Sequence, residues 1–171
     1  MKKTIVALLL VVAIKASAQN DTEFPKGFIM YLKLNNGMVT KFDASPDLYT
    51  GGLHLLPEFT VVEHLLRIGG NIGVFYTDKK VQVMAGPLVS LKLKTFNVKP
   101  FGSAGNINLT LENLWGSGDQ RLFGGGFNVD LLNKIVIGLT AHRDYNLNTW
   151  WFQNSVAFRI SKKKKVAEPF N

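Results

Sequence analysis

The sequence predicts an all-β fold, a single closed antiparallel up-and-down β-barrel of about eight transmembrane strands. Three observations lead to this fold class. Eight segments alternate between apolar and polar residues with a period of two, as strands with two unlike faces do. No apolar run after the N-terminal leader is long enough for a membrane-spanning helix. The polar face mixes glycines with balanced charges, which suits the interior of a narrow barrel.

The N-terminal residues have the composition of a secretory signal. Two lysines precede an apolar run from Ile5 to Ile14, and Ala16 and Ala18 form a small-residue cleavage site. About ten apolar residues are too few to cross a membrane as a helix. We therefore expect a cleaved signal peptide over residues 1–18, a barrel domain over residues 19–161 and a basic tail over residues 162–171.

The formal net charge of +8 does not point to a nucleic-acid partner. Much of the excess lies in the signal and in the tail, where a run of lysines begins at Lys162. A nucleic-acid site needs basic residues clustered within the fold, so we expect no such partner. The tail could still contact anionic lipid headgroups. The chain has no cysteine, so neither a disulfide nor a lipidated cysteine can hold or anchor it.

The first four predicted strands cover residues 28–34, 53–62, 66–76 and 81–93. The fourth has an apolar face that is unbroken from Val81 to Leu93. Pro57 and Pro87 stand within two of these segments. Because proline has no N–H donor for the ladder, we expect a bulge or a strand end at each of them.

The last four predicted strands cover residues 107–115, 123–131, 135–144 and 150–160. Asn113 and Asn154 interrupt the apolar faces of the first and last of these. The run from Gly124 to Gly126 has no following helix and no Lys-Ser or Lys-Thr pair, so it indicates tight packing in a strand and not a phosphate loop.

The connections alternate in length if both termini lie in the periplasm. Short turns near residues 63–64 and 132–134 fit periplasmic turns, and longer links over 35–52, 115–121 and 144–148 fit surface loops that could bind a partner. Two links depart from this rule. Thr77 to Lys79 is short for an outer loop, and residues 95–105 are long for a periplasmic turn.

The polar face decides which side of the barrel is inside, because a soluble lipocalin-like barrel would expose it. Glycines beside charges make a poor solvent surface and a plausible crowded lumen. An unpaired buried ion is costly, so equal numbers of opposite charges suit a lumen, whereas on a surface they would be scattered ion pairs. The predicted lumen charge network is Lys33, Glu58, Arg67, Lys92, Glu112, Asp130, Asp144 and Arg159.

Aromatic residues near the strand ends suggest membrane-interface belts, although an ordinary aromatic core is the alternative. Phe28 and Phe158 fall near the predicted inner ends. The predicted outer belt is Tyr76, Trp115, Tyr145, Trp150 and Trp151.

With strands, termini and lumen charges placed, the chain resembles the small outer-membrane barrels of the OmpA-transmembrane and OmpX type from Phe28 to Ile160. Such families end in an alternating, aromatic strand that the barrel-assembly machinery recognises, and TWWFQNSVAFRI is similar, although a polar tail follows it here. The resemblance implies location in a Gram-negative outer membrane. It also implies outer-membrane lipid and the assembly machinery as partners.

Some small outer-membrane barrels modify lipid A, so the segment AHRDYN needs attention. His142 and Asp144 share one face and could act as a base and its orienting group. The resembling deacylases carry a serine two residues after the histidine, where this chain has Asp144, and only Ser155 on the neighbouring strand could replace it. A histidine near an aspartate in a charged lumen is more often structural, so we expect no enzymatic activity.

His54, His142 and Glu58 raise the question of a metal site. No short spacing such as H-x-H joins them, so we expect neither a metal nor another cofactor. The sequence thus favours a non-enzymatic outer-membrane barrel with a structural or surface-interaction role. Two alternatives stay open: a membrane-embedded lipid-modifying hydrolase that uses His142 and Asp144, and a soluble periplasmic lipocalin-like barrel that binds an apolar ligand.

Overall fold

The computed structural model describes residues 27–42, 47–98, 103–131 and 134–161. The expected signal peptide over residues 1–18 and the basic tail over residues 162–171 lie outside the described residues. Eight strands follow one another along the described part of the chain: β1 (Phe28–Thr40), β2 (Leu48–Val62), β3 (Leu66–Thr77), β4 (Lys80–Val98), β5 (Ser103–Gly116), β6 (Arg121–Leu131), β7 (Ile135–Asp144) and β8 (Thr149–Arg159).

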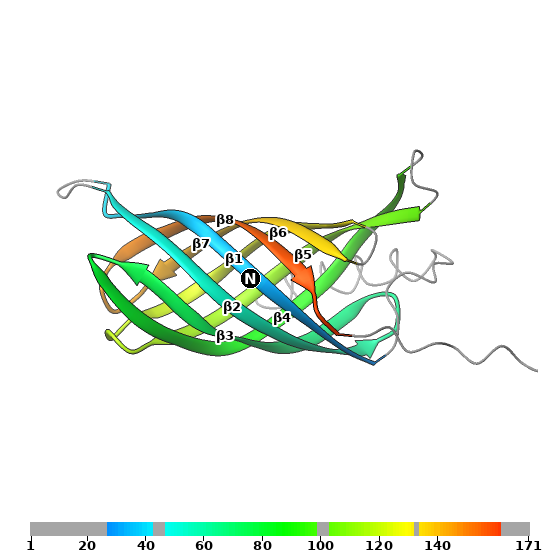
Figure 1. The fold of residues 1–171 in the computed structure, drawn as a ribbon, viewed down its shortest axis with the longest axis horizontal. Coiled ribbons are helices and arrows are strands. Elements are labelled where there is room, and N and C mark those ends of the chain that lie inside the picture. The colour runs from blue at the N-terminus through cyan, green and yellow to red at the C-terminus, as the bar shows by residue number, and fades with distance from the viewer. Residues whose placement is uncertain (1–26, 43–46, 99–102, 132–133, 162–171) are drawn as a thin grey trace, which may run out of the picture.

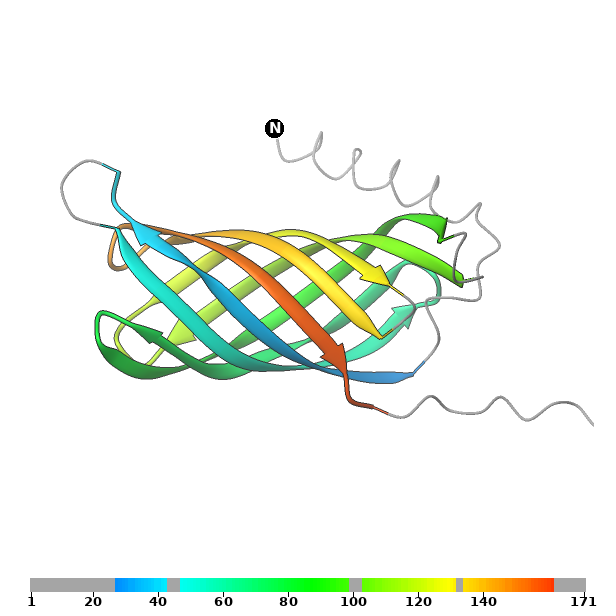
Figure 2. The same ribbon diagram turned by 45° about the horizontal axis from the view of Figure 1, so that its top comes forward.

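The strands form one closed antiparallel barrel, which confirms the predicted fold class. Each strand pairs with the next, and β8 returns to pair with β1 from Arg159 opposite Tyr31 to Trp150 opposite Thr40. The strands wind at a tilt around the long axis (Figures 1 and 2). Among the described residues no helix is long and apolar enough to cross a membrane.

The barrel has two distinct ends, which we name by what lies there. The loop end carries the connections β1–β2, β3–β4, β5–β6 and β7–β8. At the opposite terminal end β1 begins and β8 finishes, as Figure 1 shows.

Several strands are longer than the sequence predicts. Most of the expected loop over residues 35–52 is strand, with Asn35 paired to Gly52 and Val39 paired to Leu48. Likewise, most of the expected turn over residues 95–105 is strand, since β4 runs to Val98 and β5 starts at Ser103. Asn and Gly have weak intrinsic strand preference, but neighbouring strands on both sides supply ladder partners and override it.

The expected bulges at Pro57 and Pro87 are wrong. The register between β2 and β3 is the same before Pro57, at Leu55 opposite Ile72, and after it, at Glu58 opposite Gly69. Pro87 pairs in register with Gly70. The observed register shifts lie elsewhere, between Thr60 and Val62 and between Lys92 and Lys94.

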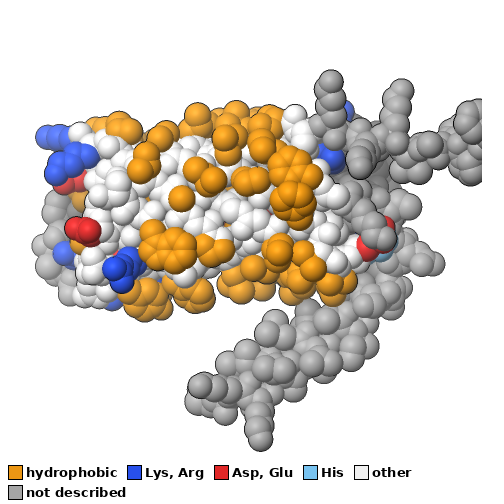
Figure 3. All heavy atoms as spheres, turned by 90° about the horizontal axis from the view of Figure 1, so that it is seen from below, with side chains coloured by type: hydrophobic (Ala, Val, Ile, Leu, Met, Phe, Trp, Pro, Cys, Tyr) orange, Lys and Arg blue, Asp and Glu red, His pale blue; other side chains and the backbone are white. Residues whose placement is uncertain are grey.

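Apolar side chains cover the outside of the barrel and polar side chains fill its interior. Leu139, at mid-strand, is 68% exposed, whereas Glu112 is only 2% exposed. Figure 3 shows hydrophobic side chains along the length of one side, with the charged side chains gathered toward the two ends. This distribution is the reverse of that in a soluble globular protein and fits a transmembrane barrel.

Two apolar clusters also lie inside the lumen, one toward each end. The loop-end cluster consists of Val39, Phe75, Met84, Leu114, Leu122 and Trp151. The terminal-end cluster consists of Ile29, Tyr31, Leu56, Leu88 and Ala157, with Val136 packed against it. Inward residues that lie between the two clusters along a strand, such as Lys33 between Tyr31 and Val39 on β1, are enclosed from both directions.

We expect Gly126→Ala to destabilise the barrel by about 1–3 kcal/mol, as overpacking does in close-packed interiors. A Cβ on Gly126 would overlap the backbone carbonyl of Leu139 on β7, which cannot move without disturbing the ladder. The matched control is Gly70→Ala, because a Cβ there meets nothing closer than the Gly86 carbonyl at 3.6 Å. Urea unfolding of the refolded barrels measures both, and equal stabilities would contradict this crowding.

Candidate functional site

The first group of buried polar side chains gathers around Glu112 on β5. We name Lys33, His54, Asn71, Glu112 and His142 the Glu112 cluster; its members come from β1, β2, β3, β5 and β7. Lys33 Nζ donates to Glu112 Oε1 over 3.5 Å, and Asn71 Nδ2 donates to the same oxygen over 3.2 Å. His142 Nε2 lies 3.0 Å from Glu112 Oε2, and His54 Nδ1 lies 2.6 Å from Asn71 Oδ1. One carboxylate thus ties together strands on opposite sides of the barrel.

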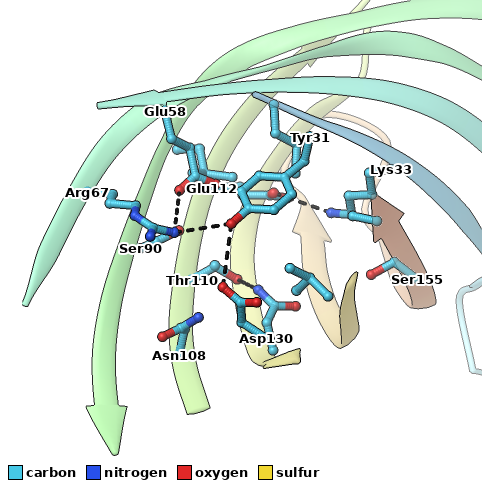
Figure 4. A pocket seen from close by; sticks show the side chains of 15 residues that line it. Tyr31, Lys33, Glu58, Arg67, Ser90, Asn108, Thr110, Glu112, Asp130 and Ser155 are labelled. Atoms are coloured by element: carbon cyan, nitrogen blue, oxygen red, sulfur yellow. Dashed lines mark hydrogen bonds and ion pairs between the residues drawn. The ribbon is translucent and has the colours of Figure 1, made fainter. Parts of the chain in front are cut away.

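The second group lies nearer the terminal end. We name Tyr31, Glu58, Arg67 and Asp130 the Arg67 cluster. Arg67 Nη1 is 3.9 Å from Glu58 Oε2 and donates to the Tyr31 hydroxyl over 3.3 Å. The Tyr31 hydroxyl in turn lies 3.5 Å from Asp130 Oδ2. Figure 4 shows these side chains pointing toward one another from β1, β2, β3 and β6.

A small cavity of about 30 Å³ separates the two clusters. Members of both clusters line it, together with Ser90, Thr110 and Ser155. Two of the residues that line the cavity are hydrogen-bonded to each other, since Asn128 Nδ2 donates to Thr110 Oγ1 over 3.1 Å. A volume of this size accommodates only one or two water molecules.

The local sequence explains how large polar side chains fit into so narrow a lumen. Period-two alternation sends every second residue inward, and glycines occupy positions beside the bulky ones. Gly73 shows this directly, because a Cβ there would stand 2.6 Å from Cγ of the His54 ring on β2. The ring occupies space that any other residue at position 73 would fill.

The predicted charge network is brought together only in part. The structure places Lys33 with Glu112, and Glu58 with Arg67 near Asp130. Lys92 is buried in the same lumen. Arg159 lies at the terminal end, where its Nε donates to Ser161 Oγ over 3.3 Å.

Asp144 is predicted as part of the lumen charge network, but in the structure it joins neither cluster. It is buried at the loop end, where its Oδ1 accepts backbone N–H bonds from Arg121, Asn146 and Leu147 at 3.0–3.2 Å. Its position at the last residue of β7 explains this, since the chain turns there and offers unpaired N–H groups. The carboxylate organises the β7–β8 connection.

Trp151 is also misplaced in the predicted aromatic belt. Successive strand residues face opposite sides, so Trp150 and Trp151 cannot both face outward. Trp151 points into the lumen, where its ring lies 5.3 Å from Phe75 and its Nε1 donates to Thr149 Oγ1 over 3.1 Å. Trp150 faces outward with the Arg143 guanidinium 5.3 Å from its ring centre.

The other predicted belt residues are exposed toward the loop end. Tyr76 and Trp115 are exposed near the ends of β3 and β5, and Tyr145 is exposed in the β7–β8 connection. At the terminal end, exposed Phe28 contacts Phe59 with ring centres 4.9 Å apart.

The residues considered for hydrolysis are not assembled. His142 contacts Glu112 and not Asp144, whose Oδ1 is engaged by backbone amides. Ser155 Oγ lies 3.5 Å from the Gly138 carbonyl and not beside His142. Within the described part of the chain, no group of three or more histidines and carboxylates is arranged to hold a metal ion.

Sequence reasoning missed Tyr31 and Asn71 as members of the two clusters. It considered His54 only for a metal site, and it considered His142 for metal, for catalysis or as a structural partner of Asp144 rather than of Glu112. The available signal was their place on the same inward face as the charges. The alternation identifies which residues face the lumen, but it does not identify which residue each of them contacts on the opposite wall.

No family model matches the chain, and no curated protein matches it in sequence. Among solved structures, one similar chain is "KdgM porin in complex with disordered oligogalacturonate". This chain is itself a closed antiparallel β-barrel. The match covers 78% of this chain and 99% of that chain, at 8% sequence identity and a TM-score of 0.32. A likeness at this level supports no conclusion about fold, function or site, so nothing is carried over from it.

We expect Glu112→Gln to lower the free energy of unfolding by about 3–5 kcal/mol, because it leaves the buried Lys33 ammonium without its counterion. Adding Lys33→Met in the same chain should recover much of this loss, since no unpaired ion then remains. A double-mutant cycle from urea unfolding followed by tryptophan fluorescence measures the coupling. Additive effects of the two substitutions would show that the pair does not interact.

Proposed function

We propose that this protein is a non-enzymatic barrel of a Gram-negative outer membrane, with a sealed lumen and a structural or surface-interaction role. The observation that carries the proposal is the inverted distribution of side chains. Exposed leucine, valine and phenylalanine cover the outside, while ion pairs such as Lys33–Glu112 lie inside. Such an outer surface is stable in contact with lipid hydrocarbon. A closed barrel is the β-structure that can span hydrocarbon, because all of its backbone N–H and C=O groups are paired within the barrel.

The proposed route to this location is export with a cleaved signal peptide, followed by insertion through the barrel-assembly machinery into outer-membrane lipid. The signal-like composition of residues 1–18 supports export. The alternating strand β8 supports insertion, since its exposed Phe158 and Val156 lie on the outer face.

A transport role is disfavoured by the filling of the lumen. The loop-end cluster places the Phe75 and Trp151 rings across the barrel interior. Beneath it the Glu112 cluster joins strands from opposite sides, and the cavity below holds only about 30 Å³. An eight-stranded barrel is just wide enough for side chains to fill it.

A surface-interaction role would rest on the loop end. Phe42, Tyr145 and Leu147 are exposed apolar residues in or next to connections there, although the connections are shorter than the sequence suggests. Exposed apolar residues at loop tips are suited to contact with another surface.

The hydrolase alternative is less well supported. His142 is buried in the lumen, enclosed by Glu112 and the loop-end cluster, whereas lipid ester bonds would lie outside the barrel. The lipocalin alternative needs an apolar cavity of several hundred Å³, roughly 300–1,000 Å³ for a small ligand. The cavity observed between the clusters has a mixed polar and apolar lining and is about ten times smaller than the lower of these values.

We expect Leu139→Arg to reduce the stability of the barrel in lipid vesicles by about 2–4 kcal/mol, because a charge at mid-depth of the outer face would stand in hydrocarbon. Tyr145→Arg at the loop end is the matched control and should cost about 0–1 kcal/mol. Heat-modifiable gel migration measures the folded fraction of each. A Leu139→Arg protein as stable as the control, together with mature protein that stays monomeric in buffer without detergent, would reject the membrane location.

We expect the wild-type barrel to show no current steps in planar lipid bilayers, because side chains close the lumen at two levels. An open porin inserted under the same conditions is the positive control. Protease resistance of the reconstituted protein verifies that it has inserted and folded. Reproducible steps that scale with the amount of inserted protein would contradict a sealed lumen.

A further inference from the structure

Two asparagines interrupt the apolar outer surface at one place. Asn36 on β1 and Asn154 on β8 are both exposed, and they are direct partners in the pairing of these two strands. Their surroundings on the same face are apolar, with Leu34 and Met38 flanking Asn36 along β1. Neither amide makes a side-chain hydrogen bond within the described residues.

The surface beside these amides is hollowed. A groove runs across the outside of β6, β7, β8 and β1, and both asparagines line it. Small residues on its path, Gly125 and Ala141, lie beside larger apolar ones such as Phe127, Leu139 and Phe152. Small residues in a lipid-facing surface allow another protein surface to approach closely.

Hydrocarbon cannot satisfy an amide, which carries two N–H donors and one carbonyl acceptor. Asn154 lies well inside the apolar surface of β8, since Trp150 precedes it toward the loop end and Val156 and Phe158 follow it on the same face. A partner protein that supplies hydrogen-bond donors and acceptors at this depth would therefore stabilise the amide.

We propose that this groove is a homodimer interface in which Asn36 of one copy bonds Asn154 of a second copy. A twofold axis along the membrane normal that lies outside the barrel and faces the pairing of β1 with β8 exchanges the two copies, so each Asn36 faces the other copy's Asn154. Because each amide both donates and accepts, two identical patches satisfy one another. The inference rests on the proposed membrane location.

The chain supplies its own control. Asn113 on β5 is likewise exposed on the outer face, but it pairs with Phe123 on β6 and lies outside the groove. It has no second asparagine opposite it in the ladder between β5 and β6. Replacing Asn113 reports the general effect of removing a lipid-facing amide.

The chain has no cysteine, so introduced thiols report proximity without background. We expect membranes that contain both Asn36→Cys and Asn154→Cys proteins to yield a disulfide-linked dimer of the two variants on mild oxidation. Membranes with Asn113→Cys protein should yield monomer under the same conditions. Absence of the dimer in folded, membrane-inserted protein would overturn the interface, and so would equal crosslinking at position 113 or crosslinking only to a different protein.

The double variant Asn36→Leu/Asn154→Leu tests the hydrogen bonds themselves. We expect the dissociation constant of the dimer in vesicles, measured by energy transfer between labelled copies, to rise by roughly tenfold. Asn113→Leu should leave it unchanged, and heat-modifiable migration verifies that each variant folds. An unchanged constant in the double variant would overturn the inference. A protein that fractionates as soluble monomer would instead defeat the membrane location, which separates the two failures.

Discussion

The pairing of β8 with β1 is the interaction on which the rest of the structure depends. It runs from Tyr31 opposite Arg159 to Thr40 opposite Trp150 and leaves no strand of the barrel with an open edge. Closure forces every second side chain into one narrow lumen and every other one onto one continuous outer surface. The outside can then be apolar, because the backbone needs no hydrogen bonds from its surroundings.

The contents of the lumen follow from this enclosure. An ion placed there loses water and needs a partner, and the partners come from distant parts of the chain. Glu112 receives bonds from Lys33, Asn71 and His142, which arrive on three other strands. The pairs therefore hold opposite walls of the barrel at fixed separation, and the same side chains that stabilise the barrel also block it. Stability and the proposed sealing of the lumen therefore share one cause.

Alternation predicts the strand interiors and their faces well, as Leu139 outside and Glu112 inside illustrate. It predicts strand ends poorly, since Asn35 and Gly37 are strand residues only because β2 and β8 pair with them. It also cannot identify partners across the lumen, because Lys33 and Glu112 lie on strands that are not neighbours. The closeness of Trp151 to the strand end predicts a place at the membrane interface, but successive strand residues face opposite sides, and its position along β8 directs it inward.

Because side chains fill the interior, the outer surface and the loop end are where a functional contact is to be sought. There, residues that obey the apolar pattern carry little information, because lipid alone explains them. Among the exceptions, Asn36 and Asn154 keep amides where leucine would suit hydrocarbon better, and unlike Asn113 they do so side by side on neighbouring strands. The asparagines at positions 36 and 154 are thus polar groups that barrel closure does not require, and association between copies is a physical role that fits them.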